Sequence, residues 1–396
     1  MFRKLLLSIL LLYGLTILVS IFLEEDSLQW DFKTYYYAGK AYASGLNPYD
    51  SKVLSQLAHT PVKQFFYPPI SLPLFKFLPA FTFEQARNLF LLLKLIILAG
   101  LIYLWKREFL NGEADLLFYV FCLFGFNGAI YLDFRAGNIS IIEQGVLWLA
   151  FMSFLRGRLL LFSLLTLFAA TFKVQPILFL VLLGFTAEKR KYLFLGTAIS
   201  LVVGVHLLSY WFHPEFFVNF ISQSSILDER GINNPSTLSL LRDVKDALGR
   251  KWIEFISPTT IYLIIVMIVL GLTSWSLRSH RKGMDKKILL YTLCITYAII
   301  IPRFKDYSYI LLLVPAYSLL KRMAPTESFP LLIILFMFSQ HFLIPGFDEL
   351  TELILWQYYP LILTSCLWLF TMVSILQGRT GILSPMAVAP GIPRDT

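Results

Sequence analysis

Long apolar runs recur along the whole chain, and their length constrains the fold more than any other feature of the sequence. A helix needs about 20 predominantly apolar residues to cross the hydrocarbon core of a bilayer. The runs at 5–23, 86–105, 191–211, 257–277 and 357–376 have this length. The further runs are 115–132, 139–155, 159–172, 174–187, 287–301, 307–320 and 329–343. The sequence therefore predicts an all-α polytopic membrane protein with about 12 transmembrane helices.

The first run is interpreted as a retained span. It ends in Glu24, Glu25 and Asp26 without the small residues of a cleavage site, so it does not resemble a signal peptide. With 57% hydrophobic and 15% charged residues, the chain also falls outside the soluble globular classes. Residues 1–378 are expected to form one integral-membrane catalytic domain, and the Pro- and Gly-containing tail 379–396 is expected to be disordered.

The residue types that bind metals or nucleic acids show no useful pattern. Cys122, Cys294 and Cys366 lie inside apolar runs, and the five histidines are scattered without ligand spacing. We therefore expect no metal and no cofactor. The net charge of +9 is explained by Lys and Arg at span ends, and no basic aromatic module for nucleic acid is present.

Basic residues in the short loops predict the orientation. Six basic clusters fall at alternate ends of the spans, namely Arg3-Lys4, Lys106-Arg107, Arg156/Arg158, Lys189-Arg190-Lys191, Arg278 to Lys287 and Lys321-Arg322. The positive-inside rule places them in the cytoplasm, with both termini, in a bacterial-type inner (plasma) membrane. This holds if 66–82, which is apolar but broken by prolines, does not cross. That segment is left as either a re-entrant element or an extra span.

The opposite, extracytoplasmic face then receives two long loops, 24–70 and 212–256. In the first, a helix is expected at 32–43 with Asp31 as its N-cap and Gly45 near its end. In the second, Asn233 to Ser236 indicates a helix start with Pro235 at an early position. Apolar residues then recur at helical spacing, as expected for a short amphipathic helix at the membrane surface.

Chemically versatile side chains collect on this outer face. They are Asp31, Asp133, Arg135, Lys173, Gln175, Asp228, Glu229, Arg230, Arg242, Arg303, Lys305, Asp306 and Tyr307. Structural interpretations remain open beside a functional one: a helix cap for Asp31, snorkelling for Lys173, a local ion pair for Asp133 with Arg135, and a solvated turn at 303–307.

Together these residue types suit an anionic ligand embedded in the membrane. Arg and Lys suit a phosphate, aromatic rings suit sugars or lipid tails, and a lone Asp suits a general base acting on a hydroxyl. Sugar transfer from a polyprenyl phosphate fits this set, because the phosphate is already a good leaving group and cationic side chains can stabilise its charge.

At these residues the sequence resembles glycosyltransferase family 87, polyprenyl-phosphate-sugar-dependent transferases of the GT-C fold. The matching features occur in order: Asp31 with the Tyr-rich residues after it, Ala38-Gly39, Gly45, Asn47-Pro48-Tyr49-Asp50, Tyr67-Pro68-Pro69, Gly137-Asn138, Lys173-Val174-Gln175-Pro176 and Pro302-Arg303. The resemblance implies an inverting transferase whose first-loop Asp, here Asp31, is the catalytic base.

The resemblance also implies outer-face cations that bind the donor phosphate. The candidates are Lys173, Arg242, Arg303 and Lys305. Many relatives have a His shortly after the late Pro motif, where this chain has Lys305, Asp306, Tyr307 and Tyr309. The candidates for substrate binding are Tyr35, Asn47, Tyr67, Asp133, Arg135, Asn138, Gln175, Asp306 and Tyr307.

The expected function is transfer of a hexose, with mannose as the expected sugar, from a polyprenyl-phosphate donor to a lipid-linked or envelope glycan. The alternative is a lipid-glycan flippase or other transporter, which predicts ionisable residues near the bilayer midplane and two symmetric halves. Lys94 and Lys173 are the basic candidates for that function, and no two-half symmetry is visible. A structural subunit would not require acids and bases collected on one face.

Overall fold

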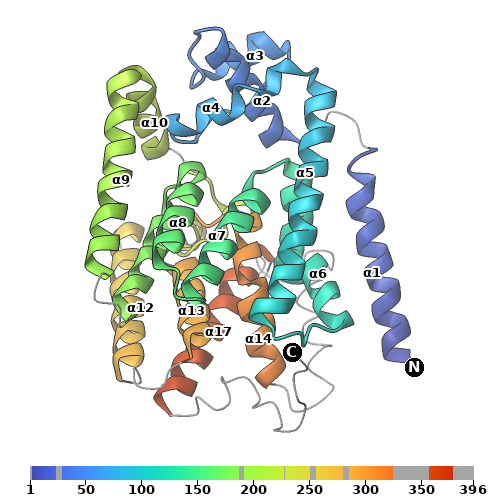
Figure 1. The fold of residues 1–396 in the computed structure, drawn as a ribbon, viewed down its shortest axis with the longest axis vertical. Coiled ribbons are helices and arrows are strands. Elements are labelled where there is room, and N and C mark those ends of the chain that lie inside the picture. Colours follow the sequence, from blue (N-terminus) through green and yellow to red (C-terminus); the bar gives the residue numbers. More distant parts are fainter. Residues whose placement is uncertain are drawn as a thin grey trace.

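The computed structural model describes residues 2–23, 29–186, 191–226, 228–249, 256–279, 285–323 and 356–377. Throughout these residues the regular structure is helical, and none of them forms a strand (Figure 1). The predicted span 329–343, the acids at 24–26 and the tail 379–396 lie outside the described residues.

Five described helices are long and apolar enough to cross a membrane. One is α5 (Phe83–Leu104), extended by a π-helical turn at Trp105–Phe109. The other four are α6 (Leu116–Ala136), α9 (Lys191–Phe212), α12 (Pro258–Ser279) and α17 (Tyr359–Leu376). The chain is therefore an integral membrane protein.

Other helices follow the remaining predicted runs. They are α1 (Phe2–Ser20), α7 (Ser140–Leu155), α8 (Leu159–Phe172), the 3-10 helix η4 (Gln175–Phe185), α13 (Lys286–Ile300), η7 (Asp306–Leu312) and α14 (Leu313–Met323). Most ends lie within three residues of the predicted ones, because charged residues such as Arg158 and Lys173 bound the apolar runs.

Short helices form a cap at one end of the molecule, opposite the start of α1 (Figure 1). The cap, residues 29–81, contains α2 (Trp30–Ala43), α3 (Ser51–Ala58), η1 (Pro69–Ser71), α4 (Leu72–Phe75) and η2 (Leu78–Ala80). The three elements of the proline-rich segment have 3, 4 and 3 residues, far short of a membrane crossing. The segment 66–82 therefore packs in the cap and does not cross.

An aromatic core separate from that of the main bundle holds the cap together. It includes Phe32, Tyr35, Tyr49, Phe65 and Phe75, each at most 4% exposed. The rings of Tyr35 and Phe75 stack with centroids 4.9 Å apart. Helix α10 (Pro214–Ile226) joins this core through Phe216, whose ring lies 6.2 Å from that of Tyr49.

The start of α2 differs from the prediction that Asp31 caps it. The helix begins at Trp30, and the N-cap is Gln29 in the left-handed conformation (φ 68°). Gln29 is fixed from the neighbouring α6, since its side-chain amide donates to the Phe134 carbonyl at 2.5 Å and its backbone N–H to the Arg135 carbonyl at 2.9 Å. Asp31 lies in the first turn, with its side chain available for other contacts.

Helix α6 is interrupted in the middle of its apolar run. Phe126, Asn127 and Gly128 have φ values of 51°, 67° and 67°, in the left-handed region. The sequence predicted a span over 115–132 but did not indicate where it would be interrupted. The ring of Phe126 stacks on Tyr309 of η7 at 5.3 Å, so the break is packed against protein, which is the usual condition for irregular backbone at membrane depth.

The second predicted outer loop contains α11 (Thr237–Leu248). Its N-cap is Ser236, whose side chain accepts a hydrogen bond from the Ser239 backbone N–H. Pro235 was predicted at an early position of the helix, but it precedes the N-cap. The predicted amphipathic character is present: Leu238 and Leu241 are half-buried, whereas Lys245 and Asp246 are exposed.

Candidate active site

A pocket of about 350 Å³ lies between the cap and the nearby ends of α7, α8 and α13. Its lining includes eight of the residues predicted from the sequence: Asp31, Tyr35, Tyr67, Lys173, Gln175, Arg303, Lys305 and Tyr307. They come from segments far apart in the chain, so the fold brings the candidate base and three of the four candidate phosphate-binding cations to one cavity.

Asp31 is held by Asn138, which lies in the link between α6 and α7. The Asn138 side-chain amide donates to Oδ2 of Asp31 at 2.6 Å. Asn138 is fully buried, and its own oxygen accepts from the backbone N–H and hydroxyl of Ser140 at 3.0 and 2.8 Å. Asn138 itself does not line the pocket; it contacts the residue that does.

Two tyrosines form the wall beside Asp31. Their hydroxyl groups lie 2.5 Å apart, and both also contact the Asn138 amide, at 3.1 Å for Tyr35 and 3.2 Å for Tyr67. Burial raises the pKa of Tyr35 and of Tyr67 well above the usual value, and the Asp31 charge adds to this. Both hydroxyls therefore stay neutral and can donate hydrogen bonds.

Lys173 lies at the end of α8, and its side chain contacts neighbouring residues of the same chain instead of extending away from the helical bundle. Its ammonium donates to the Ser140 hydroxyl at 2.6 Å and forms an ion pair with Glu143 at 2.9 Å. The same ammonium lies 5.2 Å from the centre of the Tyr307 ring. The snorkelling interpretation of Lys173 is therefore wrong.

Arg303 and Lys305 share one carboxylate. Glu229 accepts from Nε and Nη2 of Arg303 at 2.9 and 2.8 Å, and from Lys305 at 2.8 Å. Burial is the largest single influence on the pKa of Glu229 and would raise it, but the charges and hydrogen bonds of Lys305 and Arg303 together outweigh burial and leave the pKa below its ordinary value. Both cations also line the pocket, so this cluster is an ordered ion-pair group at its wall.

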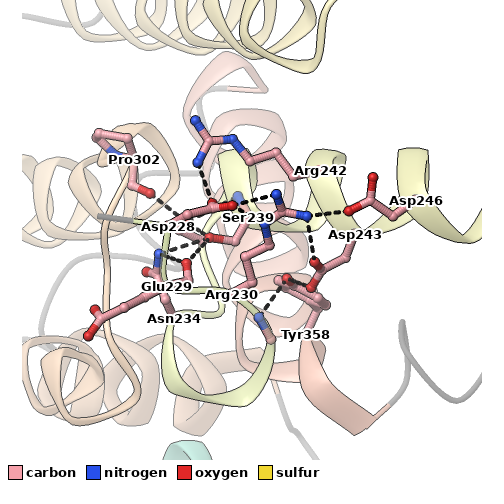
Figure 2. A network of polar contacts seen from close by, with 12 residues as sticks. Asp228, Glu229, Arg230, Asn234, Ser239, Arg242, Asp243, Asp246, Pro302 and Tyr358 are labelled. Carbon is pink, nitrogen blue, oxygen red and sulfur yellow. Dashed lines mark hydrogen bonds and ion pairs between the residues drawn. The ribbon is translucent and has the colours of Figure 1, made fainter. Parts of the chain in front are cut away.

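The segment that carries Glu229 is fixed by a polar network (Figure 2). Arg230 lies between Asp228, Asp243 and Asp246 and forms an ion pair with each of them. The side-chain amide of Asn234 donates to the Glu229 carbonyl at 3.0 Å. The Tyr358 hydroxyl, just before α17, contacts Asp243 and accepts from the Gly231 backbone N–H.

Arg242 belongs to this network. Its guanidinium pairs with Asp228 at 2.7 Å and is not part of the pocket lining. The structure thus separates Arg242 from the three cations that line the pocket.

Four other predicted residues lie away from the pocket lining. Asp133 is fully buried and pairs with Lys94 at 2.7 Å, and Arg135 is exposed. Asn47 accepts from the Tyr49 backbone N–H at 2.9 Å, which forms a local turn in the cap. Asp306 accepts from the Tyr307 backbone N–H at 2.8 Å, and burial raises its pKa to about 7.

Several residues of the pocket were not predicted from the sequence. Glu143 and Gln144 sit side by side on α7, and Gln64 and Phe66 come from the cap. The Gln144 side-chain oxygen is buried and has no hydrogen-bond partner within the described residues. The sequence contained an indication of Glu143 and Gln144, because an acid and an amide stand inside the apolar run 139–155. Ionisable residues within spans usually face a functional cavity.

The described residues contain no group of three or more His, Cys, Asp or Glu side chains that could hold a metal ion. The pocket brings the half-buried carboxylate of Asp31 together with ammonium, guanidinium and phenol groups. The fold and this pocket define a membrane protein with a polar cavity, lined by both cations and carboxylates, at one end of its helical bundle.

Comparison with known proteins identifies the family. The model of glycosyltransferase family 87 matches residues 65–302, well over half of the chain. The chain belongs to glycosyltransferase family 87 and is a membrane glycosyltransferase. No curated protein and no solved structure gave a significant match. The match includes Lys173 and ends at Pro302; Asp31, Arg303 and Lys305 lie outside it.

Proposed function

We propose that this glycosyltransferase moves a hexose, mannose in the first instance, from a polyprenyl-phosphate donor to a lipid-linked or envelope glycan, with inversion at the anomeric carbon. In this proposal residues 1–378 form one GT-C type catalytic domain of about 12 transmembrane helices in a bacterial-type plasma membrane. The cap and the pocket face the extracytoplasmic side, and both termini are cytoplasmic.

One observation carries the assignment of Asp31 as the base. The other carboxylates of this site, Glu143 and Glu229, form ion pairs with cations, whereas Asp31 accepts its hydrogen bond from a neutral amide. A carboxylate that forms an ion pair is a weaker proton acceptor, because the cation stabilises its charged form. Asp31 also lines the pocket, so a substrate hydroxyl can reach it.

The reaction then needs one proton transfer and one substitution. Asp31 takes the proton of the acceptor hydroxyl as that oxygen bonds to the anomeric carbon. The bond from this carbon to the phosphate oxygen breaks on the opposite face, and the polyprenyl phosphate leaves with an added negative charge. Lys173, Arg303 and Lys305 are positioned to stabilise that charge.

The remaining polar groups of the pocket suit the sugar and the acceptor. Gln144, Gln175 and Tyr67 can donate to or accept from sugar hydroxyls. Phe66, Phe172 and Phe220 supply apolar surface for the ring or for the first isoprene units. Where many relatives have a late His, this chain has Lys305, Asp306, Tyr307 and Tyr309, of which Lys305 and Tyr307 line the pocket.

The direct test is transfer of radiolabelled mannose from polyprenyl-phosphate-mannose to membrane lipid extract by the purified protein. We expect product from the wild type and a loss of at least about 100-fold in Asp31→Asn, since a positioned base contributes about 10²–10⁴. Asp50→Asn is the matched control, because Asp50 caps α3 in the same cap and Asn also caps well.

Equal product from wild type and folded Asp31→Asn would remove Asp31 from the mechanism. If the wild type makes no product from the mannose donor, a panel of other polyprenyl-phosphate hexoses follows. Failure with the whole panel would contradict the proposed donor class.

A further inference from the structure

The orientation of the Asn138 side chain is fixed by a group that can only donate. Its Oδ1 lies 3.0 Å from the backbone nitrogen of Ser140, and a backbone N–H cannot accept. The oxygen of the amide must therefore face Ser140. The nitrogen faces the opposite way, toward Asp31, and this assignment does not depend on how the two similar atoms of the amide are distinguished.

The direction of the next hydrogen bond follows in the same way. The Lys173 ammonium, which can only donate, lies 2.6 Å from the Ser140 hydroxyl oxygen. The hydroxyl hydrogen of Ser140 is therefore free to go to Oδ1 of Asn138, 2.8 Å away. A directed chain runs from Lys173 through Ser140 and Asn138 to Asp31, and a cation at its start strengthens each later donor.

The amide nitrogen has three oxygen neighbours for two hydrogens. Asp31 is the nearest at 2.6 Å, and the Tyr35 and Tyr67 hydroxyls lie at 3.1 and 3.2 Å. The carboxylate is the charged acceptor, and charge-assisted bonds are the shorter and stronger ones. This bond reaches Oδ2 of Asp31, and within the described part of the chain no hydrogen bond reaches Oδ1 of the same carboxylate.

We propose that Asn138 is the positioning residue of Asp31: its amide, locked by Ser140 and Lys173, occupies one carboxylate oxygen and leaves the other to take the proton of the acceptor. The proposal rests on the proposed function, in which Asp31 is the base. It gives Asn138 a role through Asp31 in place of the direct substrate contact expected from the sequence.

The first experiment does not depend on activity. A double-mutant cycle combines Asn138→Ala with Asp31→Ala and measures the apparent Tm of each purified protein in detergent. We expect Asn138→Ala to lower Tm in the wild-type background. The decrease should be smaller by at least about 2 °C in the Asp31→Ala background, because the bond between the two side chains is already missing there. Additive changes would overturn the proposal.

The second experiment separates positioning from simple space filling. Asn138→Asp keeps the shape and the acceptor for Ser140, but replaces the donor by an oxygen that faces the Asp31 carboxylate. We expect kcat to fall at least about 10-fold, while the KM for the donor changes little. A decrease of this size is typical when a residue that orients a functional group is removed. Wild-type kcat in this isosteric variant would overturn the proposal.

Gln29→Asn is the matched control. Gln29 is buried at the same junction of α2 and α6, but it contacts backbone carbonyls and not Asp31. Asn tolerates its left-handed backbone, while the shorter side chain loses the 2.5 Å bond to Phe134. We expect a lower Tm with kcat within about 3-fold of wild type.

The two proposals fail in different ways. If no donor is turned over, the proposed function fails and the thermal cycle still decides the Asn138–Asp31 contact. If the wild type is active and Asn138→Asp is equally active, the proposed function stands and the positioning role is wrong.

Discussion

Lys94 and Asp133 form an ion pair from which solvent is completely excluded. The distance from Nζ to Oδ2 is 2.7 Å, and the ammonium also donates to the Asp133 backbone carbonyl at 2.8 Å. The Lys94 ammonium lies 4.6 Å from the centre of the Phe134 ring. The pair joins α5 to the last turn of α6, directly before Gly137 and Asn138. Its position favours a structural role over the ion pathway of a transporter.

Removing one partner of this pair should be much worse than removing both. Lys94→Met leaves the Asp133 carboxylate buried without its cation, and breaking a buried pair costs about 3–5 kcal/mol. Lys94→Met combined with Asp133→Leu should regain most of the lost stability, because no isolated charge remains. Thermal unfolding in detergent measures both. A single variant as stable as the wild type would contradict the structural role.

At the scale of elements, the link between α6 and α7 positions the start of α2. Gly137 ends α6 with φ +66°, and a Cβ atom there would lie 2.5 Å from Oε1 of Gln29 and 2.7 Å from Cβ of Phe32. The close approach of α2 to this turn is what allows Asp31 to meet Asn138, 107 residues later in the chain.

Two glycine substitutions should separate the effect of the turn from that of the close approach. Gly45→Ala, at φ +71° with no atom within 4 Å of the added Cβ, should cost only the backbone strain of about 1–2 kcal/mol. Gly137→Ala adds the collision with Phe32, so it should lose more stability and also reduce transfer activity. Thermal unfolding and the mannose-transfer assay, run on both variants, check this; equal losses would show that the approach does not matter.

Local sequence predicted the elements well and the junctions between them poorly. Helix α8 was predicted at its observed limits because Arg158 and Lys173 bound its apolar run. The break in α6 was missed, although Gly125, Asn127 and Gly128 suggested it, since the stacking of Phe126 on Tyr309 is a tertiary contact. The Asp31–Asn138 bond could not be predicted, because nothing local specifies which of two distant segments meet.

For the whole molecule, the half-buried carboxyls of Asp306 and Glu229 make the stability depend on pH, and the two effects have opposite sign. Burial raises the pKa of Asp306 from 3.8 to about 7. Between these values the folded protein holds a proton that the unfolded chain has lost, so this contribution is full below pH 4 and is lost as pH rises through 7. The pKa of Glu229 is lowered, so its contribution is present above its ordinary value of 4.5 and lost as pH falls below it.

We therefore expect the apparent Tm to fall between pH 5 and pH 8, and Asp306→Asn to flatten this decline because the variant has no carboxyl to ionise there. Asp285→Asn serves as the control, since Asp285 caps α13 and an Asn there also caps. Thermal unfolding at several pH values measures the effect. An unchanged slope in Asp306→Asn would show that another group causes it.

The pairing of the pocket cations bears on how a turnover ends. Lys173 has Glu143 as its counterion, and Arg303 and Lys305 share Glu229. Counting Asp31 and the paired Glu229, three acids balance three cations, so these six side chains together carry no net formal charge. In the proposed reaction, the lipid phosphate that must leave the pocket carries more negative charge than the donor that bound there. Glu143 and Glu229 can re-form their ion pairs with these cations and so compete with the phosphate product for them. Tight binding of the leaving group then need not make product release slow.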